Sequence, residues 1–194
     1  MGTRGLCGFR YKEKDYLTYN HFDSYPDGLG LNILNEIRAM DFEKLKARVS
    51  KIEFVDTAVK PTFEEQLNIP KEFWDLTVSK GIAEDWYCLL RKSQGTIEPY
   101  YNGTLKYMID SASFIKDGLY CEWAYVVNLD TMKFEVWRGF QEKPQSRNRY
   151  GVEPKDGYYP ALLQREYDLS SLPSGKDFKE YFEVVMNEEE KEAN

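Results

Sequence analysis

Histidine and paired cysteines are nearly missing from this 194-residue sequence, and both absences limit its chemistry. His21 is the single histidine, which excludes a metal site built from several histidines. The three cysteines, Cys7, Cys88 and Cys121, lie far apart, show no CxxC spacing and are odd in number. This pattern is typical of a reducing compartment, so we predict a cytoplasmic protein with neither a metal nor another cofactor.

An excess of positive charge and long apolar runs are also missing. The chain has 26 basic and 33 acidic residues, which gives a net charge of −7. A protein that binds the phosphate backbone of nucleic acids needs a basic face, so we expect no general nucleic-acid binding. No stretch approaches the ~20 apolar residues that a membrane-spanning helix requires, so we expect no membrane association.

The chain does contain enough apolar material for one hydrophobic core. Hydrophobic residues make up 42% of the sequence and aromatic residues 15%. We therefore predict a single globular domain over residues 1–187, followed by an acidic flexible tail over residues 188–194.

Two runs rich in β-branched and aromatic residues predict hairpins. Residues 6–11 and 16–21 alternate on either side of KEKD, and residues 119–140 do so around NLDT. Residues 161–169 predict a further strand, and residues 141–160 predict a polar loop.

Helical periodicity marks much of the remaining chain. We predict helices after Pro26, after an Asp41 N-cap and after a Thr62 N-cap, with others over the ranges 71–81, 83–93 and from 176 onward. The range 103–118 is compatible with a helix or a strand, and a helix is favoured because Leu105, Met108 and Ala112 share a face. Gly81 and Gly95 are the expected helix stops. The expected fold is α+β, an antiparallel sheet built from hairpins and covered by helices in a two-layer sandwich.

One dense polar run, YNHFDSYPDGLG at residues 19–30, predicts a binding site. Strand periodicity puts Tyr19 and His21 on one face, and the run then enters a helix whose first N–H groups have no partner. Gly28 and Gly30 let an anion approach those N–H groups closely. The ligand-binding residues expected here are Tyr19, Asn20, His21, Asp23, Ser24, Tyr25, Gly28 and Gly30.

The same run also has a purely structural interpretation. Asp23 and Ser24 would make turn hydrogen bonds, and Pro26 would start the helix. The glycines would then supply unusual backbone angles, and His21 would be an ordinary strand residue.

Arginines among aromatic residues form a second candidate group. Arg147 and Arg149 lie in the long loop just before Tyr150, and Arg4 and Arg10 lie near the first strand. Such arginines hold nucleotides by charge-assisted hydrogen bonds and stacking, and Arg147 or Arg149 would neutralise a ligand at the helix entrance. The alternative is a solvated loop.

A catalytic interpretation uses His21 as a general base oriented by Asp23. A hydroxyl group or a cysteine such as Cys7, on the first strand, would then act as the nucleophile.

The opening GTRGLCGFRYKEKDYLTYNHFDSYPDGLG resembles a family of small, largely uncharacterised proteins of bacteriophages and bacterial genomes. They share a GTRG start, a short hairpin and a YNHxDSYPxGLG block, and the later EWAYVVNLD and EVWRGFQ segments are also similar. The resemblance implies a phage or prophage accessory protein in the cytoplasm of a bacterial host.

These observations predict a binding protein, not an enzyme, that holds an anionic small molecule such as a nucleotide. One alternative is a protein–protein inhibitor of a host defence factor that uses aromatic anchors. The other is a hydrolase or transferase based on His21 and Asp23.

Overall fold

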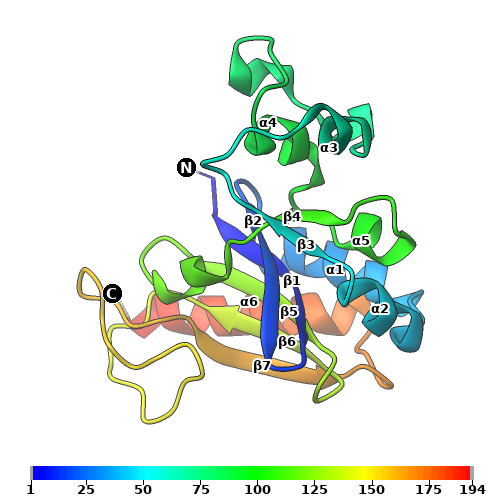
Figure 1. Ribbon diagram of the computed structural model, residues 1–194. Helices are drawn as coiled ribbons and strands as arrows, with labels where there is room; N and C mark the ends of the chain where they lie inside the picture. The colour runs from blue at the N-terminus through cyan, green and yellow to red at the C-terminus, as the bar shows by residue number, and fades with distance from the viewer. Residues whose placement is uncertain (1, 193–194) are drawn as a thin grey trace.

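In the computed structural model of the chain, which describes the backbone of residues 2–192 and the side chains of residues 2–188, a five-stranded sheet forms the centre (Figure 1). Its strands lie in the order β2-β1-β5-β6-β7. Their bounds are β1 Gly5–Tyr11, β2 Lys14–Asn20, β5 Trp123–Asn128, β6 Lys133–Arg138 and β7 Leu162–Asp168. The predicted α+β class, both hairpins and the last strand are confirmed.

The central pair of strands, β1 and β5, is parallel, whereas the hairpin pattern predicts only antiparallel neighbours. Gly5 lies opposite Trp123, and Arg10 lies opposite Asn128. Parallel neighbours need a long connection because the chain must return to the same end of the sheet. As a result, β1 and β5 both start at the end of the sheet where β2 and β6 finish.

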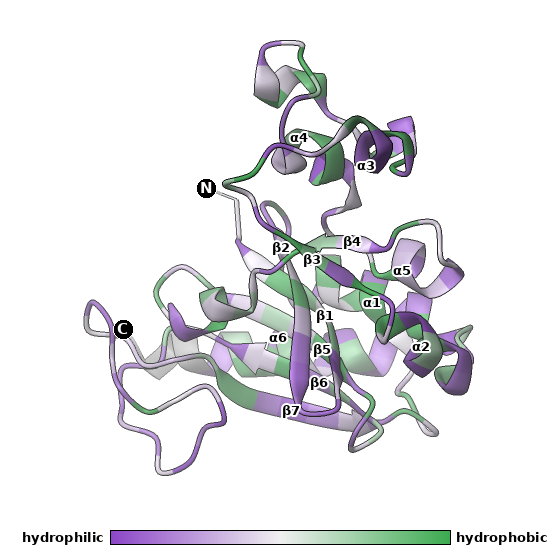
Figure 2. Cartoon of the chain, viewed as in Figure 1, coloured by the Kyte–Doolittle hydropathy of each residue, from purple (hydrophilic) through white to green (hydrophobic). Residues whose placement is uncertain are grey.

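Both faces of the sheet are buried, by different kinds of structure. On one face, Cys7 and Phe9 of β1 pack with the helices α1 (Leu31–Arg38) and α6 (Gly175–Glu192). On the other, Leu6 and Leu17 pack under the short helix η5 (Ala112–Lys116) and the loop that carries Tyr150. Figure 2 shows apolar residues concentrated on the central strands. The predicted helical cover therefore holds for one face, and mostly loop covers the second.

The predicted helix starts depend on short polar side chains that accept backbone N–H groups. Asp41 caps α2 (Phe42–Val49) by accepting from the N–H groups of Glu43 and Lys44. Thr62 caps α3 (Phe63–Leu67) in a capping box with Glu65. Pro26 opens a π-helical turn, η1 (Pro26–Gly30), that continues into α1. All three predicted starts are confirmed.

Residues 56–95 form a lobe that projects from one end of the sheet (Figure 1). The helices predicted over 71–81 and 83–93 are shorter here, in part because the Asp75 side chain accepts from the N–H of Thr77 and starts a separate turn. Gly81 and Gly95 have positive φ, as expected of helix stops. The lobe contains α3, η2 (Lys71–Phe73), η3 (Leu76–Ser79), α4 (Trp86–Leu90) and η4 (Arg91–Ser93).

The helix predicted over residues 103–118 is wrong in its first half. Residues Tyr107–Ile109 form strand β4, which pairs in parallel with β3 (Glu53–Val55). Tyr107 and Met108 are both buried, so consecutive side chains pack on both sides of this short strand. A short, fully buried strand has no alternation that sets it apart from a helix. The helix α5 (Glu98–Asn102) precedes β4.

At the C-terminal end, α6 extends to Glu192, so the tail predicted over 188–194 begins as helix. Residues 193–194 lie outside the described residues. Within residues 2–192, no helix is both long and apolar enough to cross a membrane. Cys7, Cys88 and Cys121 are buried and form no disulfide.

Candidate functional site

The end of the sheet where β1 and β5 start carries an open hollow of about 380 Å³, which we call the Arg4–His21 hollow. Its walls come from the segments before β1 and β5 and from those after β2 and β6, so the parallel central pair brings them together. The lining residues are Gly2, Thr3, Arg4, His21, Phe22, Tyr25, Leu119, Tyr120, Glu122 and Phe140. Hydrogen bonds between the backbones of Arg4 and Glu122 and between those of Thr3 and Ser24 tie these segments together.

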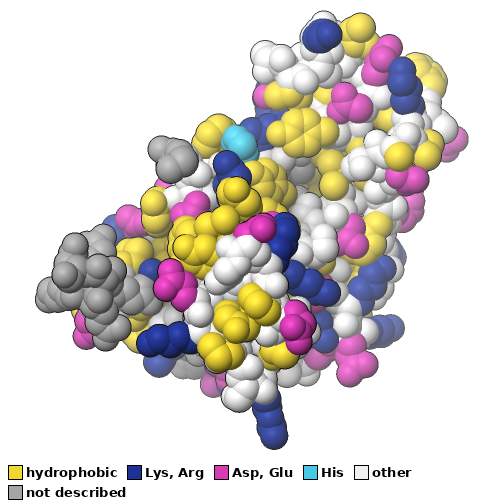
Figure 3. All heavy atoms as spheres, turned by 90° about the vertical axis from the view of Figure 1, so that its left-hand side faces the viewer, with side chains coloured by type: hydrophobic (Ala, Val, Ile, Leu, Met, Phe, Trp, Pro, Cys, Tyr) yellow, Lys and Arg dark blue, Asp and Glu magenta, His cyan; other side chains and the backbone are white. Residues whose placement is uncertain are grey.

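His21, the one cyan side chain in Figure 3, lies where the lobe meets the body, beside basic and hydrophobic side chains. Burial, followed by the positive charges of Arg91 and Arg4, lowers its pKa below the ordinary value of 6.5. Burial also raises the pKa of the Tyr19 phenol, which therefore keeps its proton. The Tyr19 hydroxyl lies 2.8 Å from Nδ1 of His21. A neutral imidazole that accepts from Tyr19 at Nδ1 carries its own proton on Nε2.

The stability of the fold is expected to decrease as the pH falls below about 6.5, because the unfolded chain binds a proton at His21 more readily than the folded chain does. This contribution is complete above the unfolded pKa and is lost as the pH falls toward the lowered folded pKa. Urea unfolding at about pH 7.5 and about pH 5.5 measures it. In His21→Gln the loss should be smaller, and the remainder is the part due to carboxylates. Equal losses in both proteins would contradict the lowered pKa.

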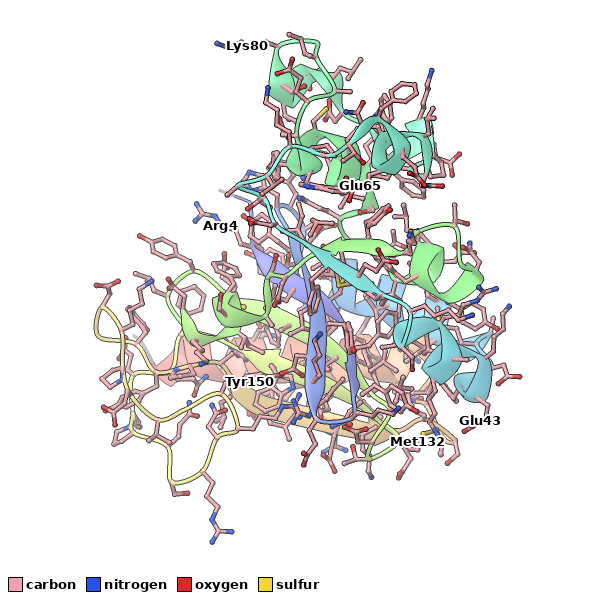
Figure 4. All side chains as sticks on the ribbon, viewed as in Figure 1. Arg4, Glu43, Glu65, Lys80, Met132 and Tyr150 are labelled. Carbon is pink, nitrogen blue, oxygen red and sulfur yellow. The ribbon has the colours of Figure 1, made fainter. Side chains whose placement is uncertain are left out.

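Two arginines set the charge around His21. Arg4 stacks over the ring of Tyr120, with its guanidinium carbon 5.3 Å from the ring centroid. Arg91, from η4 of the lobe, lies 6.0 Å from the ring centroid of Phe22 and donates to the side-chain oxygen of Gln94. Among the side chains of residues 2–188, neither guanidinium forms an ion pair with a carboxylate. Figure 4 labels Arg4 at the junction of the lobe and the sheet.

Exposed aromatic rings surround the hollow. The exposed fractions are 60% for Phe22, 43% for Tyr25, 45% for Tyr120 and 45% for Phe140. Phe140 has a φ of 57°, an uncommon left-handed conformation for a bulky residue. Thr3 also lines the hollow, and its hydroxyl is buried without a hydrogen-bond partner among the described residues.

The polar run at residues 19–30 is divided between the hollow and a turn. His21 and Tyr25 line the hollow, and Tyr19 supports His21 from behind. Asn20 is buried and donates to the side-chain oxygen of Ser24 at 2.8 Å and to the backbone oxygen of Phe22. Ser24 is fully buried, and its backbone oxygen accepts from the hydroxyl of Tyr125 at 2.9 Å. For Asn20 and Ser24, the structure thus matches the turn interpretation.

The N–H groups of Gly28 and Gly30 are not free, which corrects the expectation of an anion site at these two glycines. The N–H groups of both glycines donate to the backbone oxygen of Tyr25, at 3.1 and 3.2 Å, and that of Leu29 donates to Asp23 at 2.9 Å. The glycines are needed for packing. A Cβ at Gly28 would lie 2.6 Å from the carboxylate carbon of Asp23, and one at Gly30 would lie 2.6 Å from the ring of Tyr125.

Arg149 and the helix entrance lie on opposite faces of the sheet, so the structure does not combine them into one site. Leu29 of the entrance packs with Cys7 and Phe9. Arg149 stacks 4.5 Å over Trp137, which belongs to the core on the other face. Figure 4 places Tyr150, the neighbour of Arg149, well away from Arg4.

Arg149 has a structural role in a buried network. Its guanidinium donates to both carboxylate oxygens of Glu135, at 2.8 and 2.6 Å. Glu135 is only 3% exposed and also accepts from the side chains of Asn128 and Trp137. Arg147 is exposed on the same loop and makes no such contact. Every lone pair direction of the carboxylate is thus engaged by the protein itself.

The structure places neither the Asp23 carboxylate nor the Cys7 thiol beside His21, as the catalytic interpretation requires. The partner of His21 at Nδ1 is Tyr19, and the carboxylate of Asp23 lies against Gly28. Cys7 is fully buried on the other face of the sheet, and burial raises the pKa of its thiol far above the ordinary value. Among the described side chains, which end at residue 188, no group of three or more from His, Cys, Asp or Glu is placed to hold a metal ion.

Sequence reasoning missed Arg91, Tyr120 and Phe140, which become neighbours of His21 through pairing between distant strands. No family model, curated protein or solved structure matches the chain. The candidate function must therefore be argued from the residues of the hollow.

Proposed function

We propose that this chain is a binding protein that holds an anionic small molecule such as a nucleotide in the Arg4–His21 hollow. The resemblance of residues 2–30 to a family of small phage and bacterial proteins supports a role as a phage accessory protein. The observation that carries the proposal is a hollow lined by Arg4 and His21, with Arg91 close enough for its charge to lower the pKa of His21; neither arginine forms an ion pair with a carboxylate among the side chains of residues 2–188.

The charge distribution supports an anion as the ligand. The chain has a net charge of −7, yet Arg4 and Arg91 remain without an acidic partner in the described part of the chain. Guanidinium groups make their strongest hydrogen bonds to carboxylates and phosphates. The Nε2–H of His21 is a further donor in the same place, and it requires no change of protonation at neutral pH.

The aromatic rim supports an organic anion over an inorganic one. Phe22, Tyr120 and Phe140 present flat apolar surfaces on which a planar group can stack. A small inorganic anion would leave these surfaces unused.

Replacing Arg4 or Arg91 by alanine is expected to weaken nucleotide binding by about ten- to a hundredfold, because each change removes a charge-assisted hydrogen bond worth about 1.5–3 kcal/mol. Isothermal titration with a panel of nucleoside mono-, di- and triphosphates measures the affinities. Arg147→Ala is the matched control, since it removes the same charge from an exposed position outside the hollow. A wild-type protein that gives no heat with any nucleotide would refute the proposal.

A second candidate function, inhibition of a host protein, is favoured by a different surface. On α3 of the lobe, Phe63 is 76% exposed and Leu67, one helical turn later, is 70% exposed. Apolar side chains of this size on one helix face are typical of protein contacts. The double variant Phe63→Ser/Leu67→Ser should then lose capture of a partner from host lysate and keep nucleotide binding. Capture that survives the double change would remove α3 from consideration.

A further inference from the structure

A smaller cavity of about 230 Å³ lies between β2 and the α4–η4 segment of the lobe. We call it the ring cavity. Its wall includes Thr18 and Tyr19 of β2, Tyr87, Leu90 and Gln94 from the lobe, and Ser111. Nothing in the preceding proposal uses it.

Two side chains connect the ring cavity to the Arg4–His21 hollow. Tyr19 forms part of the cavity wall, and its hydroxyl contacts His21 of the hollow at 2.8 Å. Arg91 also lies near one aromatic ring of the ring cavity and one of the hollow. Its guanidinium lies 5.6 Å from the ring centroid of Tyr87 and 6.0 Å from that of Phe22. A ligand bound by Arg91 and His21 therefore lies beside the cavity.

The wall of the ring cavity matches a planar ring that carries a few polar atoms. Most of it is apolar, formed by aromatic rings and by Leu90 and Ile109. Thr18 and Ser111 also line it, and neither hydroxyl has a hydrogen-bond partner among the side chains and backbone of residues 2–188. A cavity of about 150 Å³ accommodates a benzene ring, so this one has room for a larger heteroaromatic ring. A plain alkyl chain would leave both hydroxyls unpaired.

We infer that the ligand is an anion joined through a short spacer to a heteroaromatic ring, such as a purine nucleoside monophosphate. The phosphate lies at Arg4, Arg91 and His21, and the base enters the ring cavity behind Tyr19. This inference rests on the proposed function and extends it, because it specifies the second half of the ligand and where that half binds.

Titration of the wild-type chain with AMP, ribose 5-phosphate and adenosine separates the two halves of the ligand. AMP should bind at least about tenfold more tightly than ribose 5-phosphate, since a stacked base adds that much or more. Ser111→Leu places a bulky side chain in the cavity and should reduce AMP affinity to that of ribose 5-phosphate, which itself stays unchanged. Ser113→Leu is the matched control, because Ser113 is exposed and does not line the cavity.

Tyr87→Ala provides a second test that does not depend on whether the Ser111→Leu protein folds. Tyr87 is 41% exposed, and its removal should weaken AMP binding but not ribose 5-phosphate binding. Equal affinities of AMP and ribose 5-phosphate would overturn the ring inference and leave the anion proposal standing. If the advantage of AMP persists in both variants, the base binds elsewhere and the inference is wrong. If neither phosphate binds, both proposals fail.

Discussion

Arg149→Ala is expected to lower the free energy of unfolding by about 3–5 kcal/mol, one of the two largest effects we predict. Glu135 is 3% exposed, and Arg149 supplies the only positive charge within salt-bridge distance of it among the described residues. Removal of the guanidinium leaves a buried carboxylate with only the two neutral donors, Asn128 and Trp137. Urea unfolding at neutral pH measures the change.

Arg147→Ala is the control for this experiment, since it removes an exposed arginine two residues earlier on the same loop. Its effect should stay within about 0.5 kcal/mol. Neither substitution should change nucleotide affinity under conditions in which the variant is folded. An Arg149→Ala protein as stable as wild type would show that the buried network contributes little. Loss of nucleotide binding in a folded Arg149→Ala protein would return this arginine to the ligand site.

Gly30→Ala is expected to destabilise the fold by about 1–3 kcal/mol, the cost of overpacking a filled core. The new Cβ would lie 2.6 Å from the ring of Tyr125, which is fully buried and fixed by its hydrogen bond to the backbone oxygen of Ser24. The ring cannot move without breaking that bond or disturbing the core around it. Thermal unfolding measures the loss.

Asn32→Ala is the control for Gly30→Ala, because Asn32 is exposed on the first turn of the same helix. It should leave the unfolding temperature nearly unchanged. The folded Gly30→Ala protein should bind nucleotide as the wild type does, since the N–H of Gly30 is bonded to Tyr25. A stable Gly30→Ala protein with lost affinity would instead support an anion at the helix entrance.

Local elements could be predicted from the sequence because their signals lie within a few residues of one another. The KEKD and NLDT hairpins, the Asp41 and Thr62 caps and the strand at 161–169 are all of this kind. The lobe was harder to predict because its turns are short, and β4 because both of its sides are buried. Neither leaves a regular period in the sequence.

The candidate site could be predicted only in part, because the sequence does not specify which strands pair in parallel. His21 and Tyr25 do line the hollow, but Phe140 lines it from a distant segment, and Arg91 of the lobe lies next to Phe22 in its wall. Because the sequence does not show which face of the sheet a segment covers, it predicted that Arg149 joins the helix entrance in one site, although the sheet separates the two. The polar run at residues 19–30 and the arginines among aromatic residues predicted an anion site, and the topology of the sheet determines which arginines lie near it.

The parallel pairing of β1 with β5 also has a consequence for biosynthesis. The backbones of Arg4 and Glu122, 118 positions apart, meet at the wall of the hollow. A ribosome that has released only the first hairpin and the lobe has made His21 and Arg91 but not the wall formed by Tyr120 and Phe140. The emerging chain therefore gains a complete binding hollow only late in translation, so ligand cannot assist the earliest steps of folding.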